Sequence, residues 1–139
     1  MREKGVGTLT VLVTDDFDEL RSLLRSWIER FGYRVMEAAN GSEAVAVAIR
    51  ERPELILMDL YMPEVDGFVA AARIREHEEL KHVPIIGMSA YEESAADTQL
   101  RLDPLGVGFN AYLVKPFGPE QLGELLERFL PRSRGASAK

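Results

Sequence analysis

Short apolar segments recur along the chain and alternate with stretches whose apolar residues have helical spacing. Segment 9–14 is rich in β-branched side chains and runs into two acids, which is the pattern of a buried strand. Segment 33–38 is less uniformly apolar, which favours a position at the edge of a sheet. Together the apolar segments predict five strands, at 9–14, 33–38, 55–59, 83–88 and 111–114.

Between these segments the apolar residues follow the period of an α-helix. From Leu20 to Phe31 they recur at intervals of three and four, and Gly32 follows as a stop signal. An Asn-Gly-Ser sequence at 40–42 opens the next helix, which ends before Pro53 because the residue preceding a proline disfavours helical geometry. The remaining predicted helices are 68–74, 92–102 and 119–130.

Strict alternation of strands and helices predicts an α/β fold, with a doubly wound parallel sheet and helices on both faces. The short connections leave no room for a second domain. We therefore expect an N-terminal extension at 1–8, one domain at 9–130 and a flexible basic tail at 131–139. Sheets of this kind bind ligands beyond the carboxyl ends of their strands, so the functional groups are expected there.

Composition narrows the function classes. The 139 residues include 17 basic and 23 acidic side chains, and a net charge of −6 disfavours nonspecific binding to nucleic acid. The absence of cysteine excludes disulfides, thiolate metal sites and a cysteine nucleophile. No apolar run reaches the roughly 20 residues that cross a bilayer, and residues 1–7 lack the apolar core of a secretory signal. We expect a soluble cytoplasmic protein without membrane contact.

Acidic, hydroxyl and ammonium groups follow four of the predicted strands. They are Asp15 and Asp16 after the first strand, Asp59 at the end of the third, Ser89 after the fourth and Lys115 after the fifth. Because parallel strands place their carboxyl ends at one edge of the sheet, these groups can converge. Clustered carboxylates suit a hard divalent cation such as Mg²⁺, which keeps water and phosphate oxygens in its other positions. The ammonium and the hydroxyl suit the oxygens of a phosphoryl group.

Each of these residues also has an ordinary structural explanation. Asp15 or Asp16 can cap the next helix, and Ser89 can cap the helix that follows it. Asp59 can form the turn after its strand, and Lys115 can be a solvated lysine. Taken singly, capping is the stronger explanation for the first pair and for Ser89, and the two explanations of Asp59 are equal. Taken together, they require every functional group to fall on one edge by chance, which favours a shared site.

Four motifs resemble a known family. They are Val-Thr-Asp-Asp at 13–16, Leu-Met-Asp-Leu-Tyr-Met-Pro-Glu-Val-Asp-Gly at 57–67, Met-Ser-Ala at 88–90 and Tyr-Leu-Val-Lys-Pro-Phe at 112–117. In this order, and on these strands, they resemble the receiver domain of two-component response regulators, in its single-domain, chemotaxis-regulator-like form. The resemblance covers residues 9–130 and implies a flavodoxin-like (βα)5 fold with five parallel strands.

The resemblance implies a chemical role for each matching residue. Asp59 would be the phosphoacceptor, a carboxylate nucleophile that attacks the phosphoryl group of a phosphohistidine. Asp15, Asp16 and Asp59 would bind Mg²⁺ together with the backbone carbonyl of Tyr61, and Mn²⁺ is an alternative ion. Lys115 would pair with the phosphoryl oxygens.

The resemblance also implies a conformational switch. Ser89 would move towards the new phosphate, and Tyr112 would follow inward as the switch aromatic. Pro116 would form a cis peptide bond with Lys115, a geometry available chiefly before proline.

Three positions beside the site would tune the lifetime of the phosphoryl group. We expect the rings of Tyr61 and Tyr91 to overhang the phosphoryl group and hinder the water that would hydrolyse it. An equal alternative is that both are ordinary surface tyrosines. Ala90 is small and leaves a path for the donor. The segment from 89 to 115 is longer than the family pattern by roughly one helical turn. The fourth helix is therefore expected to end early, before a longer loop.

The predicted function is that of a phosphoacceptor signalling protein. Its donor would be a histidine kinase or a histidine phosphotransfer protein, and its target a protein that the sequence does not identify. It would catalyse only its own phosphorylation and dephosphorylation. It would bind no nucleic acid directly, and a homodimer is among its possible assemblies. We expect a stand-alone receiver because no effector domain follows the last helix.

Two other functions fit parts of the pattern. A Mg²⁺-dependent aspartyl phosphatase would turn over free phosphomonoesters with a nucleophile on the first strand. A receiver-like interaction module would keep the fold and never be phosphorylated. The complete acidic set with Lys115 disfavours the module, because a scaffold has no need for crowded like charges.

Overall fold

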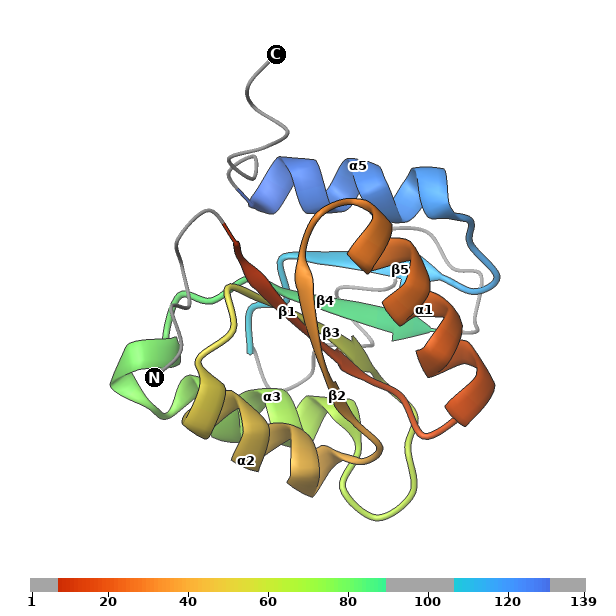
Figure 1. Cartoon of the computed structure of the whole chain (residues 1–139). Helices are drawn as coiled ribbons and strands as arrows, with labels where there is room; N and C mark the ends of the chain where they lie inside the picture. The colour runs from red at the N-terminus through yellow and green to blue at the C-terminus, as the bar shows by residue number, and fades with distance from the viewer. Residues whose placement is uncertain (1–7, 90–106, 131–139) are drawn as a thin grey trace.

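A computed structural model describes residues 8–89 and 107–130, and these form a five-stranded parallel sheet flanked by helices (Figure 1). The strands are β1 (Thr10–Thr14), β2 (Arg34–Ala38), β3 (Leu55–Asp59), β4 (Ile85–Ser89) and β5 (Ala111–Val114). Their order across the sheet is β2-β1-β3-β4-β5. The predicted α/β class is confirmed, and β2 lies at an edge as its mixed sequence indicates.

Helices cover both faces of the sheet. On one face lie α1 (Asp18–Arg30) and α5 (Pro119–Phe129), and on the other α2 (Gly41–Glu51) and α3 (Gly67–Arg75), with the 3-10 turn η1 (Glu78–Leu80) after α3 (Figure 1). The predicted helix 92–102 lies outside the described residues, as do residues 1–7 and the tail 131–139. Within the described residues, no helix combines the length and apolar character that crossing a membrane requires.

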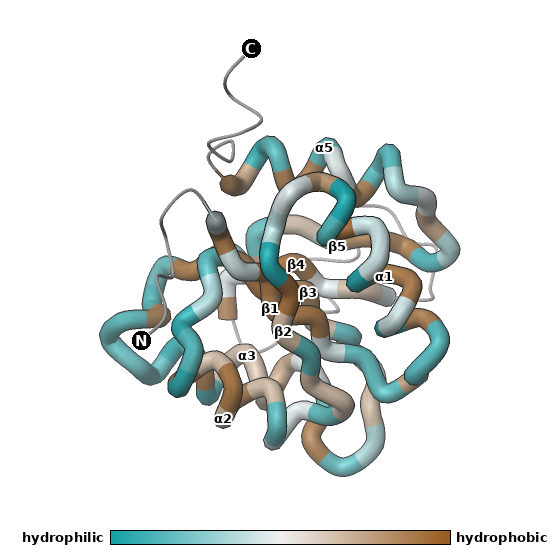
Figure 2. Tube along the Cα trace, in the orientation of Figure 1, coloured by the Kyte–Doolittle hydropathy of each residue, from teal (hydrophilic) through white to brown (hydrophobic). Residues whose placement is uncertain are grey.

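The core has two layers because strand side chains alternate between the faces of the sheet. Leu12 and Ile56 pack beneath α2 and α3, whereas Val13 and Leu57 pack beneath α1 and α5. The central strands are therefore buried on both faces, and Figure 2 shows them as hydrophobic colour running through the middle of the molecule. Burial on both sides explains why these strands read as unbroken apolar runs.

Element boundaries follow local chemistry. β4 begins at Ile85, two residues later than predicted, because Pro84 has no N–H to donate to a neighbouring strand. Gly32 takes φ 100°, a conformation open to glycine, directly after α1. The Asn40 side chain accepts from Glu43 N at 2.8 Å, which confirms the predicted opening of α2.

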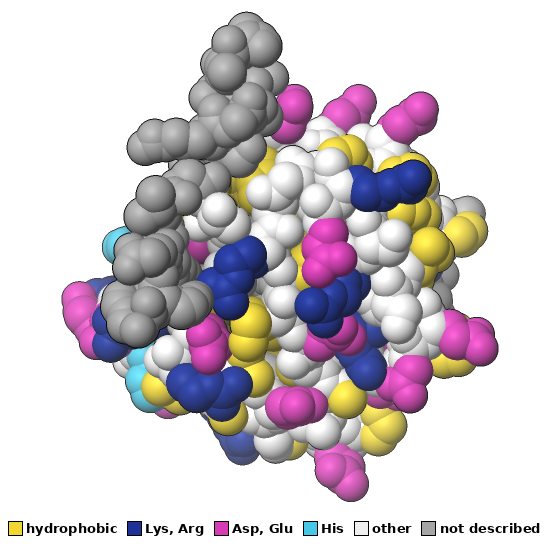
Figure 3. All heavy atoms as spheres, viewed as in Figure 1, with side chains coloured by type: hydrophobic (Ala, Val, Ile, Leu, Met, Phe, Trp, Pro, Cys, Tyr) yellow, Lys and Arg dark blue, Asp and Glu magenta, His cyan; other side chains and the backbone are white. Residues whose placement is uncertain are grey.

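Two features fix the edges of the sheet, Gly67 at the carboxyl edge and Arg75 at the amino edge. At Gly67 an added Cβ would collide with the backbone carbonyl of Asp59, so only glycine lets α3 begin this close to the end of β3. The Arg75 guanidinium, at the end of α3, donates to the carbonyls of Val83 at 2.6 Å and Gly108 at 3.0 Å. It therefore ties the approach to β4 to the approach to β5. On the face shown in Figure 3, acidic and basic side chains are interspersed rather than gathered by sign.

Candidate active site

Acidic side chains from β1 and β3 meet at the carboxyl edge of the sheet. Asp15 is fully buried and Asp59 is 5% exposed, while Asp16 is exposed. One carboxylate oxygen of each lies within 4.8 Å of the others, and among the described residues no other three Asp, Glu, His or Cys side chains come close enough to share a metal ion. The predicted convergence of these acids is present.

The two buried acids are each held by the loop that follows them. Phe17 N donates to Asp15 Oδ1 at 2.9 Å, and Tyr61 N donates to Asp59 Oδ1 at 3.2 Å. The N-cap of α1 is Phe17, which has no side-chain cap hydrogen bond, so neither preceding aspartate caps α1. One oxygen of each buried acid thus serves the local turn, and the other remains for the site.

Lys115 supplies the positive charge. Its Nζ lies 3.1 Å from Asp15 Oδ2 and 3.6 Å from Asp59 Oδ2. Its backbone N donates to the carbonyl of Ser89 at 2.6 Å, and its peptide bond to Pro116 is cis. The ammonium comes from β5 and reaches across β4 to the acids of β1 and β3.

Asp59 is not an ordinary carboxyl group. Burial raises its pKa to about 6, and the negative charge of Asp15 acts in the same direction. The Lys115 ammonium and the Tyr61 amide oppose the rise in pKa without cancelling it. Three acids surround one ammonium, so a further cation would stabilise the ionised form of Asp59. The donor set is all oxygen, which fits Mg²⁺.

An open cleft of about 460 Å³ gives access to these groups. Its lining residues are Asp15, Asp16, Phe17, Leu20, Asp59, Tyr61 and Lys115. Tyr61 is 47% exposed and packs edge-on against the ring of Phe68, with centroids 6.3 Å apart. A small anionic group entering this cleft would meet the acids, the ammonium of Lys115 and the aromatic ring of Tyr61.

The predicted switch residues lie near the cleft but not on its described lining. Ser89 is 2% exposed at the end of β4, directly after Met88, which pairs with Asp59. Tyr112 is partly buried on β5, with its ring 5.5 Å from that of Phe109. Ala90 and Tyr91 lie outside the described residues.

Sequence reasoning did not single out Arg21 or Glu37. Arg21 Nη1 donates to the backbone carbonyl of Asp15 at 2.7 Å, and its Nε donates to Glu37 Oε1 at 2.8 Å. The available signal was a basic residue flanking the apolar stripe of α1, next to Leu20. That signal is weak, because most helices carry basic residues beside such a stripe.

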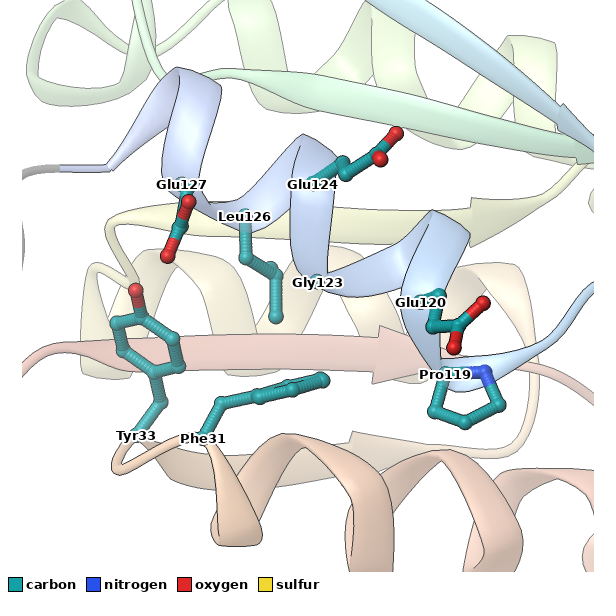
Figure 4. Close-up of a pocket in the computed structure, with 8 residues that line it drawn as sticks. All are labelled: Phe31, Tyr33, Pro119, Glu120, Gly123, Glu124, Leu126 and Glu127. Carbon is teal, nitrogen blue, oxygen red and sulfur yellow. The ribbon is translucent and has the colours of Figure 1, made fainter.

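A second cavity, of about 310 Å³, lies between the end of α1 and α5 (Figure 4). The Phe31 ring lies beneath α5 at Gly123, where an added Cβ would come 2.9 Å from the ring. Glu120, Glu124 and Glu127 also line it, with no cation among its lining residues. This cavity brings no lysine close to its acids, so we place the candidate active site in the cleft around Asp59.

Comparison with known proteins agrees with this geometry. Residues 11–127 match the family described as the response regulator receiver domain. The chain belongs to that family. Receiver domains are signalling phosphoacceptors that bind Mg²⁺ in an acidic pocket and interact with histidine kinases or phosphotransfer proteins. The predicted family and signalling role are therefore confirmed.

One curated relative of this receiver domain is the transcriptional regulatory protein SrrA of Staphylococcus aureus. The two are 34% identical over 129 residues, which cover 93% of this chain and 51% of SrrA. The receiver domain thus spans about half the length of the curated relatives it matches.

Two solved structures have the same architecture. Chemotaxis protein CheY4 of Vibrio cholerae superposes with a TM-score of 0.80 at 34% identity, over 88% of this chain and 99% of CheY4. The receiver domain of sensor histidine kinase PA1611 from Pseudomonas aeruginosa gives a TM-score of 0.78 at 34% identity, over 88% and 97% of the two chains. That structure has a magnesium ion coordinated in its active site cleft.

Proposed function

We propose that this receiver domain accepts a phosphoryl group on Asp59 while Mg²⁺ is bound by Asp15, Asp16 and Asp59. The observation that carries this assignment is the position of Asp59, which shares one cleft with two other acids and lies 3.6 Å from the Lys115 ammonium. The backbone carbonyl of Tyr61 is proposed as a further ligand, and Mn²⁺ as a substitute ion.

Asp59 suits the role of nucleophile better than Asp15. Asp15 is fully buried, and the Lys115 ammonium lies closer to Asp15 Oδ2, at 3.1 Å, than to Asp59 Oδ2, at 3.6 Å. The raised pKa of Asp59, about 6, makes its carboxylate more basic than an ordinary aspartate while leaving it ionised at neutral pH. Asp59 therefore combines access to the cleft with the stronger nucleophile.

In the transfer step, an Asp59 oxygen attacks the phosphorus of a phosphohistidine. The new P–O bond forms as the P–N bond breaks, and the leaving imidazole keeps the electron pair and takes a proton from solvent. Bound Mg²⁺ would neutralise charge on the phosphoryl oxygens. Lys115, whose Nζ lies 3.6 Å from Asp59 Oδ2, pairs with a phosphoryl oxygen.

Phosphorylation would then act as a switch. The phosphoryl group carries about −1.5 to −2 charge and three strong acceptors, in place of the single negative charge of the Asp59 carboxylate. The Ser89 hydroxyl, at the end of the neighbouring strand, gains a charge-assisted hydrogen bond by turning towards the phosphate. Tyr112 packs beside Gly87, two residues earlier on the same strand, where an added Cβ would come 3.0 Å from the Tyr112 ring. Movement at Ser89 is proposed to change the space open to Tyr112.

The donor is proposed to be a histidine kinase or a histidine phosphotransfer protein, acting in the cytoplasm, as is typical of response regulators. We assign the receiver domain to residues 9–130, with an extension before it and a basic tail at 131–139. Its chemistry is limited to gaining and losing its own phosphoryl group, and its output is binding to a protein target.

A small phosphodonor tests this function. The protein is incubated with Mg²⁺ and acetyl phosphate, alongside Asp59→Asn, and the product is measured by intact mass and by its stability to acid and base. One acid-stable, base-labile phosphoryl group per chain, absent from the variant, is expected. Continuous hydrolysis of p-nitrophenyl phosphate would instead indicate an aspartyl phosphatase. No adduct would indicate an interaction module, and either result would overturn the proposal.

A further inference from the structure

Arg21 joins three parts of the molecule at the edge of the site. Its Nη1 donates to the backbone carbonyl of Asp15 at 2.7 Å, its Nε to Glu37 Oε1 at 2.8 Å and its Nη2 to Asp18 Oδ1 at 2.7 Å. These partners belong to the loop after β1, to β2 and to the first turn of α1. The Arg21 side chain is 15% exposed, so the guanidinium is largely enclosed by the groups it binds.

Glu37 gives Arg21 a fixed anchor. Its second oxygen accepts from Arg25 Nη1 at 2.6 Å, so the carboxylate bridges two arginines of α1. Burial alone would raise the pKa of Glu37, but hydrogen bonds from Arg25 and Arg21 lower it below its usual value. The anchor therefore stays charged at neutral pH.

The bond to Asp15 controls the geometry of the acidic loop. The carbonyl that Arg21 binds belongs to the peptide unit joining Asp15 to Asp16, so it sets the plane of that peptide. Asp15 N, on the other side of the residue, donates to the Ala38 carbonyl at 3.1 Å. The backbone of Asp15 is thus tied to β2 from both sides, directly by Ala38 and through Arg21 by Glu37. Asp16 is exposed, so its position depends on this backbone.

We propose that Arg21 is a positioning residue, which holds the peptide between Asp15 and Asp16 in the orientation that lets the two acids share a Mg²⁺ ion with Asp59. The inference rests on the proposed metal site. Groups that orient the ligands of a metal commonly change its affinity by 10- to 100-fold.

The sign of the effect separates positioning from charge. Arg21 carries a positive charge near a proposed cation site, so a purely electrostatic role would make its removal strengthen Mg²⁺ binding. Loss of positioning instead weakens Mg²⁺ binding, because the acids must be ordered when the ion binds. Arg25 offers a matched control, since it also lies on α1 and binds Glu37. Its other hydrogen bond goes to Glu29, whereas that of Arg21 goes to the Asp15 carbonyl.

The test compares Arg21→Met, Arg21→Lys and Arg25→Met by Mg²⁺ titration in a calorimeter. We expect Arg21→Met to weaken Mg²⁺ binding about tenfold, Arg25→Met to leave it within about twofold, and Arg21→Lys to fall between. In the metal-free proteins, amide hydrogen exchange at Asp16 and Phe17 should speed up in Arg21→Met alone. At saturating Mg²⁺ the phosphorylation rate of Arg21→Met should approach that of the wild type.

Equal or tighter Mg²⁺ binding in Arg21→Met would overturn the inference, and so would equal losses in Arg21→Met and Arg25→Met. Should Arg21→Met fail to fold, Glu37→Gln removes the charge of the anchor with little change of shape, and unchanged Mg²⁺ affinity there would also overturn it. A wild-type protein that binds Mg²⁺ but gains no phosphoryl group would refute the proposed function and leave the positioning role standing.

Discussion

Lys115 lies beside Asp59 in the cleft, with 3.6 Å between Nζ and Oδ2. We predict that Lys115→Met lowers the rate of phosphorylation by acetyl phosphate about 100-fold, because a fixed charge facing the transferring group contributes on this scale. The rate is measured by intact mass over time. Lys81→Met is the control, since Lys81 is exposed and pairs only weakly with Glu78 at 3.8 Å. A loss below about threefold in Lys115→Met would contradict the assignment.

The pKa of Asp59 predicts how stability depends on pH. Burial raises this pKa to about 6, above the roughly 3.9 of an aspartate in an unfolded chain. Between these two pKa values the folded metal-free protein binds more protons than the unfolded chain. Its free energy of unfolding should therefore fall as pH rises from about 4 to about 6.5.

Asp59→Asn removes this titration. We predict that, in EDTA at pH 7.5, the variant has a free energy of unfolding about 1–2 kcal/mol higher than the wild type, after allowance for screening by water in the cleft. At pH 4 the two proteins should be nearly equal, because Asp59 is then protonated. Urea unfolding at both pH values measures this difference. The same gap at both pH values would exclude the ionised carboxylate as its source.

Tyr61 is predicted to lengthen the lifetime of the phosphoryl group. Its ring is half exposed at the rim of the cleft and rests against Phe68, so it can cover the approach of water to Asp59. Tyr61→Ala should lose phosphate several times faster than wild type, and Tyr61→Phe, which keeps the ring, should match wild type. Equal half-lives for all three proteins would show that Tyr61 is only a surface tyrosine.

Gly67 is predicted to be intolerant of any side chain. An added Cβ would meet the carbonyl of Asp59 and lie 2.8 Å from Leu60 Cα, and backbone atoms have little room to move. Gly67→Ala should lower the free energy of unfolding by about 1–3 kcal/mol. Gly118→Ala is the matched control, since its Cβ would have nothing within 4 Å. Similar losses in both variants would contradict the close approach of α3 to β3.

The sequence predicts the fold well where the pattern is local. Each of the five strands falls within two residues of its predicted start, because runs such as 55–59 are apolar on both faces and end in a charged residue. Asn40 and Gly32 are correct helix boundaries, since capping and left-handed backbone depend on residue type. The stripe of α1 is less informative: Leu24 and Ile28 are buried, whereas Leu23 is 45% exposed. Periodicity shows which side of a helix is apolar but not how far the neighbouring elements cover it.

The residues of the candidate site also divide into those that the sequence predicts and those that it does not. The positions of Asp15, Asp16, Asp59 and Lys115 could be predicted because each lies at or just after the end of a strand, and parallel strands end at one edge. Arg21 could not, because its role depends on a carbonyl in the loop after β1 and a carboxylate of β2 that approach only in the folded chain. Ser89 and Tyr112 remain predictions, since their roles concern a phosphorylated state.

Chemical trapping of the phosphorylated protein tests the central claim most directly. Borohydride reduces an aspartyl phosphate to homoserine, which survives digestion and peptide mapping. After incubation with Mg²⁺ and acetyl phosphate, we predict homoserine at position 59 alone, and none when EDTA replaces Mg²⁺. Homoserine at position 15 or 16, or labelling that persists in EDTA, would contradict the assignment of Asp59 as a magnesium-dependent phosphoacceptor.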